Sequence, residues 1–369
     1  MTERDFYLGF ALTNGIGPKR FASLLTIFKT AKNIWNASEL ELKAAGLGPV
    51  SLQKFINFKK EFNLSSYSQK LKKAGVSFVA LCDKNYPQLL KKLDDAPIVL
   101  FCKGDIDVLQ GAVIKGAEVD TIAIVGTRKI TNYGREVTKL FATDLALAGF
   151  TIVSGLAMGV DAVAGWSAIA AGGKTIAVLG SGIDLCYPPV NKPLYDKIIR
   201  DGGVVASEFP MGMQPNFGTF PSRNRIIAGL SLGVLVTEGA EDSGSLITAN
   251  VALAINRPAF AIPGPITSSL SKAPLKLIGK GGKLVTSADD ILKELKVSSF
   301  AKASDGQAKF TNLSKDELKI VQLLENEGLS FDEIIHRSRL DSSIIASLIS
   351  MLEIKEVIKN SDGLFQLNP

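Results

Sequence analysis

Short apolar runs alternate with helical segments between residues 121 and 285. The run 121–125, Thr-Ile-Ala-Ile-Val, is continuous and rich in β-branched residues, which is typical of a strand buried on both faces. Further runs of this kind lie at 151–153, 175–179, 204–206, 233–237, 259–262 and 283–285, with helices expected at 134–148 and 160–171. This alternation predicts a parallel, doubly wound α/β sheet, which binds ligands at the carboxyl ends of its strands.

The residues before this sheet have a different pattern. Aromatic and aliphatic residues recur at helical spacing from Phe6 to about residue 72, and Gly15-Ile16-Gly17 and Gly46-Leu47-Gly48 interrupt them. The first turn, followed by Lys19 and Arg20, resembles a helix-hairpin-helix, although an ordinary helical bundle with tight turns explains it too. Two strand-like pieces around a short helix then lead into the main sheet.

The C-terminal pattern predicts a winged helix. Helices are expected at 315–325, 331–337 and 342–352, and a hairpin at 357–367. The third helix carries no Lys or Arg, so contact with protein is favoured over reading of a DNA groove. The expected domains are a helical domain at 1–72, an α/β domain at 73–298, a polar linker at 299–312 and a winged helix at 313–369.

Composition excludes several classes of site. The net charge of +6 is compatible with a nucleic-acid partner without requiring one. Three cysteines and the single His336 cannot supply a zinc site, so no metal is expected. No apolar run reaches the length of a membrane span, and the N-terminus lacks the apolar stretch of a signal peptide. We therefore expect a cytoplasmic protein without membrane contact.

Neither of two nucleotide-binding signatures is complete. Gly180-Ser181-Gly182 begins like a dinucleotide loop, but Leu185 stands at the third glycine position. Gly173-Lys174-Thr175 precedes a strand, whereas the end of a Walker loop follows one. The α/β domain holds no histidine, and its strand-end carboxylates, Asp161, Asp184 and Glu238, are separate and typical of caps. No cofactor and no catalytic set are expected.

An anion site is expected around residues 219–247. Arg223-Asn224-Arg225 follows a proline at the start of one predicted helix, and Ser243-Gly244-Ser245 opens another. Helix N-termini present free N–H groups and a positive dipole end to an anion. Arg128 follows the first strand at the same edge of the sheet. The alternatives are that Arg223 or Arg225 pairs with Glu208 or Glu238, that Asn224 caps a helix and that Phe220 is core.

An ordered series of motifs between residues 15 and 292 resembles one family. The motifs are Gly126-Thr127-Arg128, 152–161, 175–184 with Tyr187-Pro188 and Asn191, 207–210, 220–231, 243–249 and Pro263-Gly264. Together they resemble the DprA/Smf family of DNA-processing (DNA-protecting) proteins. The chain departs from the family pattern at Gly165, at Glu238-Gly239 and at 273–275, which leaves the predicted anion site intact.

The resemblance implies an extended Rossmann-like sheet with an N-terminal helix-hairpin-helix or SAM-like domain and a C-terminal winged helix. It implies a homodimeric, non-catalytic protein that binds and protects single-stranded DNA and loads RecA onto it during natural transformation.

Carried over by motif, the expected DNA contacts are Gly126, Thr127, Arg128, Arg223, Asn224, Arg225, Ser243, Gly244 and Ser245, with Phe220, and also Phe217, available to stack on bases. Two other functions stay open. One is a phosphoribohydrolase-like enzyme, whose glycine-rich loop is missing at 237–245. The other is a regulatory scaffold that acts through the winged helix.

Overall fold

The computed structural model describes residues 1–110, 113–114, 117–118, 120–296, 314–324, 328–338, 340–355, 357–361 and 363–367. The helices are α1 (Glu3–Leu12), α2 (Pro18–Phe28), α3 (Ala31–Asn36), α4 (Glu39–Ala44), α5 (Pro49–Glu61), α6 (Leu64–Lys73), α7 (Gln88–Lys91), α8 (Asn132–Leu147), α9 (Val160–Ala170), α10 (Lys192–Arg200), α11 (Thr219–Leu230), α12 (Gly244–Ala254), α13 (Lys272–Gly279), α14 (Ala288–Leu295), α15 (Lys315–Leu324), α16 (Phe331–Ser338) and α17 (Ser342–Ile354). Short 3₁₀ turns are η1 (Ile106–Gln110), η2 (Pro189–Asn191) and η3 (Ser269–Ser271).

The strands are β1 (Ser77–Ala80), β2 (Val99–Gly104), β3 (Val113–Ile114), β4 (Ala117–Glu118), β5 (Thr121–Val125), β6 (Thr151–Ser154), β7 (Thr175–Val178), β8 (Val204–Ser207), β9 (Val234–Val236), β10 (Ala259–Ala261), β11 (Lys283–Leu284), β12 (Leu329–Ser330), β13 (Ile358–Ser361) and β14 (Leu364–Leu367). All seven strands expected between residues 121 and 285 are present, each within two residues of its predicted bounds.

Within the described residues, one sheet of nine strands has the order β1-β2-β8-β7-β6-β5-β9-β10-β11. The strands from β5 to β11 all run parallel to one another, whereas β2 runs antiparallel to β8 and β1 antiparallel to β2. The chain builds outward from β5 toward β8, then returns to the other side of β5 and builds toward β11. The predicted doubly wound α/β sheet is thereby confirmed, with an antiparallel hairpin added at one edge.

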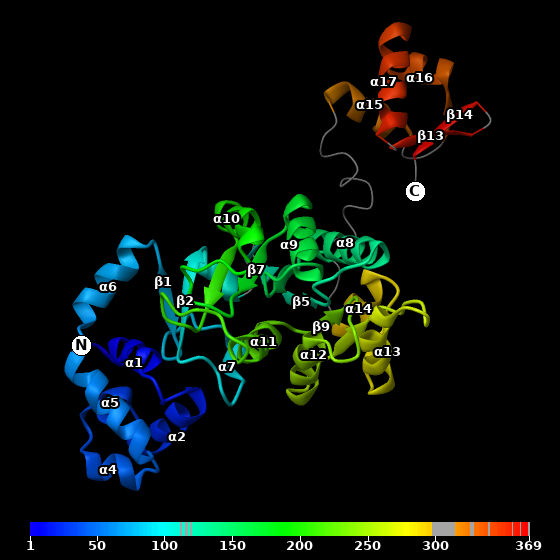
Figure 1. Ribbon diagram of the computed structural model, residues 1–369. Helices are drawn as coiled ribbons and strands as arrows, with labels where there is room; N and C mark the ends of the chain where they lie inside the picture. The colour runs from blue at the N-terminus through cyan, green and yellow to red at the C-terminus, as the bar shows by residue number, and fades with distance from the viewer. Residues whose placement is uncertain are drawn as a thin grey trace. The chain divides into compact units, whose positions relative to one another are not determined.

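Helices cover both faces of this sheet. Figure 1 shows α8, α9 and α10 on one side and α11, α12 and α13 on the other. Two apolar clusters correspond to these layers: one joins α8 and α9 to the sheet, and the other joins α11 and α12 to its opposite face. Since both faces are covered, the central strands β5 to β10 are buried along their length, as the continuous apolar runs require.

The N-terminal helices have an aromatic core that continues onto the sheet. Phe10 stacks on Phe55 at 5.3 Å between ring centroids, and Trp35 packs edge-on against both. The same apolar cluster includes residues of β2 and β8. Pro18 and Pro49 start α2 and α5 directly after the two glycine turns, so these turns separate helices as predicted.

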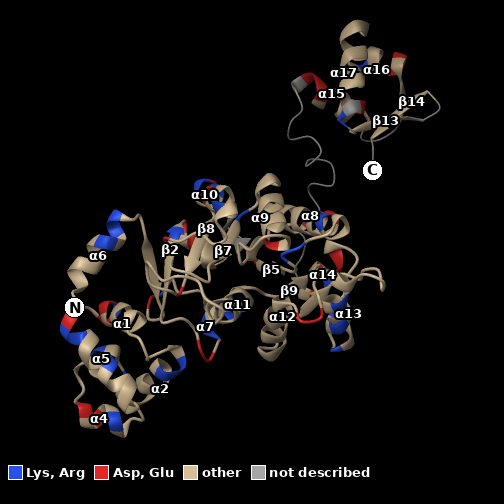
Figure 2. Ribbon diagram, in the orientation of Figure 1, with Lys and Arg blue, Asp and Glu red and all other residues tan. Residues whose placement is uncertain are grey.

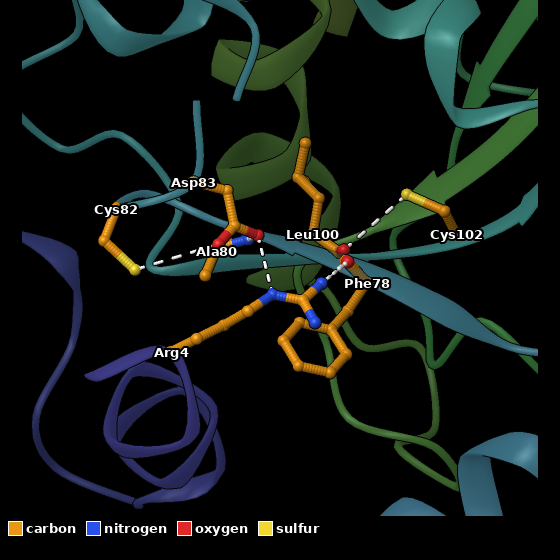
Figure 3. A network of polar contacts seen from close by, with 7 residues as sticks. All are labelled: Arg4, Phe78, Ala80, Cys82, Asp83, Leu100 and Cys102. Carbon is orange, nitrogen blue, oxygen red and sulfur yellow. Dashed lines mark hydrogen bonds and ion pairs between the residues drawn. The ribbon is translucent and has the colours of Figure 1, made fainter. Parts of the chain in front are cut away.

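Arg4 connects the first helix to the edge strand. Its Nε donates to Asp83 at 2.8 Å and its terminal nitrogen donates to the carbonyl of Phe78 at 2.6 Å (Figure 3). The guanidinium also lies 4.0 Å from the centroid of the Phe78 ring. The two cysteines nearby are both free thiols: Cys102 is buried in β2 and Cys82 is exposed.

The C-terminal residues form a separate compact unit. The division falls at residue 299, and the second unit has its own apolar core. Its described residues contain α15, α16 and α17 with a small sheet of order β12-β14-β13, which confirms the winged helix; β12 was not predicted. The linker expected at 299–312 lies outside the described residues, and the boundary at 72 remains a prediction.

No helix in the described ranges is long and apolar enough to cross a membrane.

Arg257 stabilises the carboxyl end of α11. Its terminal nitrogen donates to the carbonyls of Ala228, Gly229 and Ser231 at 2.7, 2.7 and 2.6 Å, and its other nitrogen donates to Leu89. The last carbonyls of a helix have no partner within the helix, and a cation there also complements the helix dipole. This buried arginine therefore fixes the end of the helix that carries Phe220 and the run Arg223-Asn224-Arg225 of the predicted site.

We expect Arg257→Ala to lower the free energy of unfolding by about 3 kcal/mol, because several buried carbonyls lose their donor. Urea unfolding measures this difference. The matched control is Arg200→Ala, in which an exposed arginine is removed and the change stays within about 0.5 kcal/mol. Equal stability of the two variants would contradict the role assigned to Arg257.

Candidate nucleic-acid interface

A cavity of about 310 Å³ lies where the strand order reverses. Its walls come from the loop after β5, the loop after β9 and the first turns of α11 and α12. β5 and β9 are neighbours in the sheet, and the chain leaves them in opposite directions. The crevice at such a switch point is the usual ligand site of a doubly wound sheet.

All eleven predicted contact and stacking residues lie in the described part of the chain, and nine of them line this cavity, whereas Arg225 and the exposed Phe217 do not. The nine are Gly126, Thr127, Arg128, Phe220, Arg223, Asn224, Ser243, Gly244 and Ser245. The structure therefore brings together almost the whole predicted set, from three separate stretches of sequence. Their role in binding DNA stays a prediction.

The loop after β5 is held closely against its neighbours. The N–H of Thr127 donates to the carbonyl of Glu238 at 2.7 Å, and the carbonyl of Thr127 accepts from the N–H of Val160 at 3.1 Å. A Cβ at Gly126 would lie 2.6 Å from the Glu238 carbonyl oxygen, so only glycine fits there. The backbone of this loop is thus fixed between β9 and α9, and it presents the side chain that follows.

That side chain is Arg128, which is exposed and makes no ion pair or hydrogen bond within the described ranges. Its guanidinium carbon lies 5.2 Å from the centroid of the Phe220 ring, within the range of a cation–π contact. Lys129 is also exposed and lines the same cavity. Two cations on a rigid loop are therefore free to contact an anion.

Arg223, in contrast, is a buried structural residue. Only 4% of it is exposed, and its terminal nitrogen donates to the carbonyls of Gly155 and Val178 at the ends of β6 and β7. Burial lowers the pKa of its guanidinium to about 10, so it stays charged at neutral pH. Its hydrogen bonds attach α11 to the sheet. Arg223 is structural, as one alternative supposed, but its hydrogen-bond partners are backbone carbonyls and not Glu208 or Glu238.

Asn224 and the serines connect α11 to α12. The side-chain N–H of Asn224 donates to the carbonyl of Gly244 at 3.2 Å, and its oxygen accepts from Arg223 Nε at 3.2 Å. Ser243 caps α12, since its oxygen accepts from the N–H of Ser245 at 3.3 Å. The predicted helix start at 243–245 is confirmed. Asn224 is not a helix cap, because α11 begins earlier, at Thr219.

Arg225 lies outside the cavity, which corrects the expectation that it sits beside Arg128. Its side chain is mostly buried, pairs with Glu208 and has Asp95 at 3.7 Å. Burial raises the pKa of Glu208, and the Arg225 charge opposes that shift. Arg225 instead lines a different, larger opening of about 770 Å³, together with Lys19 and other residues of the first glycine turn.

Two buried carboxylates near the cavity have structural partners. Asp161 accepts hydrogen bonds from the N–H groups of Gly155 and Ala157 at 2.9 and 3.3 Å, and burial raises its pKa against the effect of Arg223. Both carboxylate oxygens of Glu238 accept from Thr131, one from its N–H at 3.0 Å and one from its hydroxyl at 2.6 Å. Glu238 does not line the cavity, which disfavours it as a catalytic residue.

The expected contacts omitted two residues that the structure places at this site, although Tyr187 belongs to one of the quoted motifs. Lys129 directly follows Arg128, and Tyr187 follows the loop after β7; both positions belong to the carboxyl edge of the sheet. Their position after predicted strands, at the edge where ligands bind, was the sequence signal that could have identified them. No group of His, Cys, Asp or Glu side chains able to hold a metal is found among the residues that the structure describes.

Fold and cavity define a class, the Rossmann-like proteins that bind a ligand at a switch point. Family models then match two parts of the chain: DNA recombination-mediator protein A over residues 77–296 and the DprA winged helix domain over residues 307–363. The chain therefore belongs to the DNA recombination-mediator protein A family, whose relatives are named DprA or Smf.

Individual relatives agree with this assignment. The chain is 36% identical to protein Smf of Synechocystis sp. over 80% of its length and 73% of the relative's. It is 42% identical to the DNA processing protein DprA of Bacillus subtilis over 60% and 72%. Among solved structures, that of DprA from Streptococcus pneumoniae matches with a TM-score of 0.69 at 34% identity, covering 80% of this chain and 98% of that one. The DprA structure from Helicobacter pylori, described by its single-stranded DNA binding mode, matches with a TM-score of 0.53 at 29% identity, over 60% and 95%.

Stability measurements separate the two arginines of the cavity. We expect Arg223→Met to lower the free energy of unfolding by about 3 kcal/mol, because two buried carbonyls and the Asp161 charge lose their partner. Arg128→Ala should change it by less than about 0.5 kcal/mol, since Arg128 is exposed. Chemical denaturation of both variants tests this, and an Arg223→Met protein as stable as wild type would refute the structural role.

Proposed function

We propose that this chain binds single-stranded DNA in the cavity between β5 and β9, without reacting with it, and loads RecA recombinase onto the strand. The observation that carries the proposal is the exposed Arg128, which makes no ion pair or hydrogen bond among the described residues, beside the Phe220 ring at the same cavity. The cation can bind a phosphate and the aromatic ring can stack on a base, so the two side chains together suit a nucleic-acid strand.

Two further points support a binding role. The first is family membership, because one relative's structure is described by its binding of single-stranded DNA. The second is the position of Glu238, whose two oxygens are occupied by Thr131 and which is absent from the cavity wall. A phosphoribohydrolase-like reaction would require a carboxylate free to contact the sugar.

Binding in a salt series tests the role of Arg128. We expect Arg128→Ala to weaken binding of an oligothymidylate by about tenfold and to reduce the salt slope by about 0.7, the contribution of one phosphate on a single strand. Fluorescence anisotropy at several salt concentrations measures both quantities.

The matched control is Arg200→Ala. Arg200 ends α10 just before β8, so it lies at the amino-terminal ends of the parallel strands, whereas the cavity lies at their carboxyl ends. Its side chain is 70% exposed. Its removal should change affinity little. If wild type fails to bind single strands, the proposed function is wrong; if Arg128→Ala binds with unchanged affinity and slope, Arg128 has no part in it.

RecA loading requires its own experiment. We expect the wild-type chain to accelerate the DNA-dependent ATPase activity of RecA on single strands coated with single-strand-binding protein, and Arg128→Ala to lose most of the acceleration because it holds the strand weakly. An effect that persists fully in Arg128→Ala would separate loading from this cavity. The homodimer implied by the resemblance is part of the same proposal, and sedimentation equilibrium tests it.

We further propose that the winged helix contacts protein. Residues 314–367 contain six Lys or Arg against ten Asp or Glu, an unfavourable balance for a DNA phosphate surface. Figure 2 draws α17 almost entirely in tan, and Ile344 and Met351 on it are exposed. A chain that ends at residue 298 should therefore bind duplex DNA as well as the full chain does; a marked loss would indicate that the winged helix binds DNA.

A further inference from the structure

A second, smaller cavity adjoins the first on the other side of Phe220. It measures about 50 Å³ and is lined by Arg128, Gly155, Ala157, Met158, Gly180, Tyr187, Pro188, Phe220 and Arg223. Arg128, Phe220 and Arg223 line both cavities. We call the surface formed by Met158, Tyr187 and Phe220 the aromatic slot. Nothing in the assigned site explains why these apolar side chains are placed at its mouth.

Tyr187 is the main exposed surface of the slot. Its ring centroid lies 5.7 Å from that of Phe220 with an angle of 39° between the planes, so Phe220 supports it from one side. The side chain is 46% exposed, and its hydroxyl has no hydrogen-bond partner in the described part of the chain. Met158 beside it is equally exposed and flexible. A tyrosine that belongs to the core would be buried, and one that serves as a hydrogen-bonding residue would have a partner for its hydroxyl.

The distribution of charge around the slot indicates which part of a nucleotide each surface suits. Arg128 is the exposed cation of the slot, and it stands between the two cavities. Arg223 is buried and donates to backbone carbonyls. No Asp, Glu or Lys lines the slot. A neutral, partly aromatic surface suits the face of a nucleobase, and the cation next to it suits the phosphate that links two nucleotides.

We propose that Tyr187 is a base-stacking residue for a second nucleotide of the bound strand. One nucleotide occupies the larger cavity, Arg128 contacts the linking phosphate, and the next base lies on the exposed face of Tyr187 with Met158 at its edge. The slot has room for only one or two water molecules, so the base covers its mouth without entering it. This inference rests on the proposed binding of single-stranded DNA.

The arrangement also gives a physical reason for preferring single strands. A base that stacks on Tyr187 is turned toward the protein and cannot keep its partner in a duplex. Stacking of this kind tolerates every base, since each has an aromatic face. The slot should therefore select the strandedness of DNA and not its sequence.

The test compares Tyr187→Ala, Tyr187→Phe and wild type on two strands of equal length, an oligothymidylate and an abasic deoxyribose-phosphate strand. On oligothymidylate, Tyr187→Ala should bind roughly 5- to 150-fold more weakly, the range expected for loss of one base–aromatic stack. On the abasic strand it should bind as wild type does. Tyr187→Phe should keep full affinity on both, because the hydroxyl has no partner.

Two further measurements complete the comparison. The matched control is Val190→Ala, which removes an apolar side chain, 68% exposed, from the same loop but outside both cavities. It should not change affinity for either strand. The salt slope of Tyr187→Ala should equal that of wild type, because no charge is lost, whereas Arg128→Ala reduces the slope on both strands.

Three results would overturn the inference. Equal loss on both strands would make Tyr187 a structural support of Phe220. No loss on oligothymidylate, or failure of Tyr187→Phe to restore affinity, would exclude stacking. None of these results affects the proposed function as long as wild type binds the oligothymidylate, so the two failures are distinguishable.

Discussion

The candidate site depends on one buried guanidinium. Arg223 attaches α11 to the ends of β6 and β7, and the same helix carries Phe220 and Asn224 to the cavity. A Cβ at Gly155 would lie 2.1 Å from this guanidinium, so the loop after β6 approaches it as closely as a backbone can. A buried charge of this kind is tolerated because carbonyl dipoles and Asp161 surround it. The cavity is therefore rigid on the side of α11, while its free cations lie on the opposite loop.

Much of the fold could be predicted because burial on both faces leaves a clear pattern. Strands β5 to β10 are apolar runs, and β5, β6, β8 and β9 end at or directly before a glycine, serine or threonine where the chain turns. The start of α12 was equally clear, since a serine cap has a specific hydrogen-bonding role. The two strand-like pieces expected before the main sheet are present as β1 and β2, but their antiparallel pairing, like the short β12, could not be placed, because it depends on tertiary contacts and not on their own pattern.

The site was harder to predict, and the run Arg223-Asn224-Arg225 shows why. Consecutive residues on a helix point about 100° apart, so three polar neighbours cannot face one ligand. Arg223 reaches the sheet, Asn224 reaches α12, and Arg225 reaches Glu208 on another side. The motif was located correctly, but its residues have different tasks. Exposed residues such as Lys129 and Tyr187 leave no periodic signal, and although Tyr187 belongs to a quoted motif, its place at the site follows from the fold.

The cavity's small number of free cations has a consequence for long DNA. Of the described residues that line the larger cavity, Arg128 and Lys129 are the exposed cations, so under the proposed function each chain would neutralise little charge and would hold a short stretch of strand weakly. When a strand spans the cavities of two associated chains, the second contact becomes intramolecular, with an effective concentration in the millimolar range for a short connection. Residence time then grows steeply with strand length. If the proposed homodimer binds DNA in this way, short fragments would dissociate quickly, and long strands would be retained by avidity without any additional contact in the individual site.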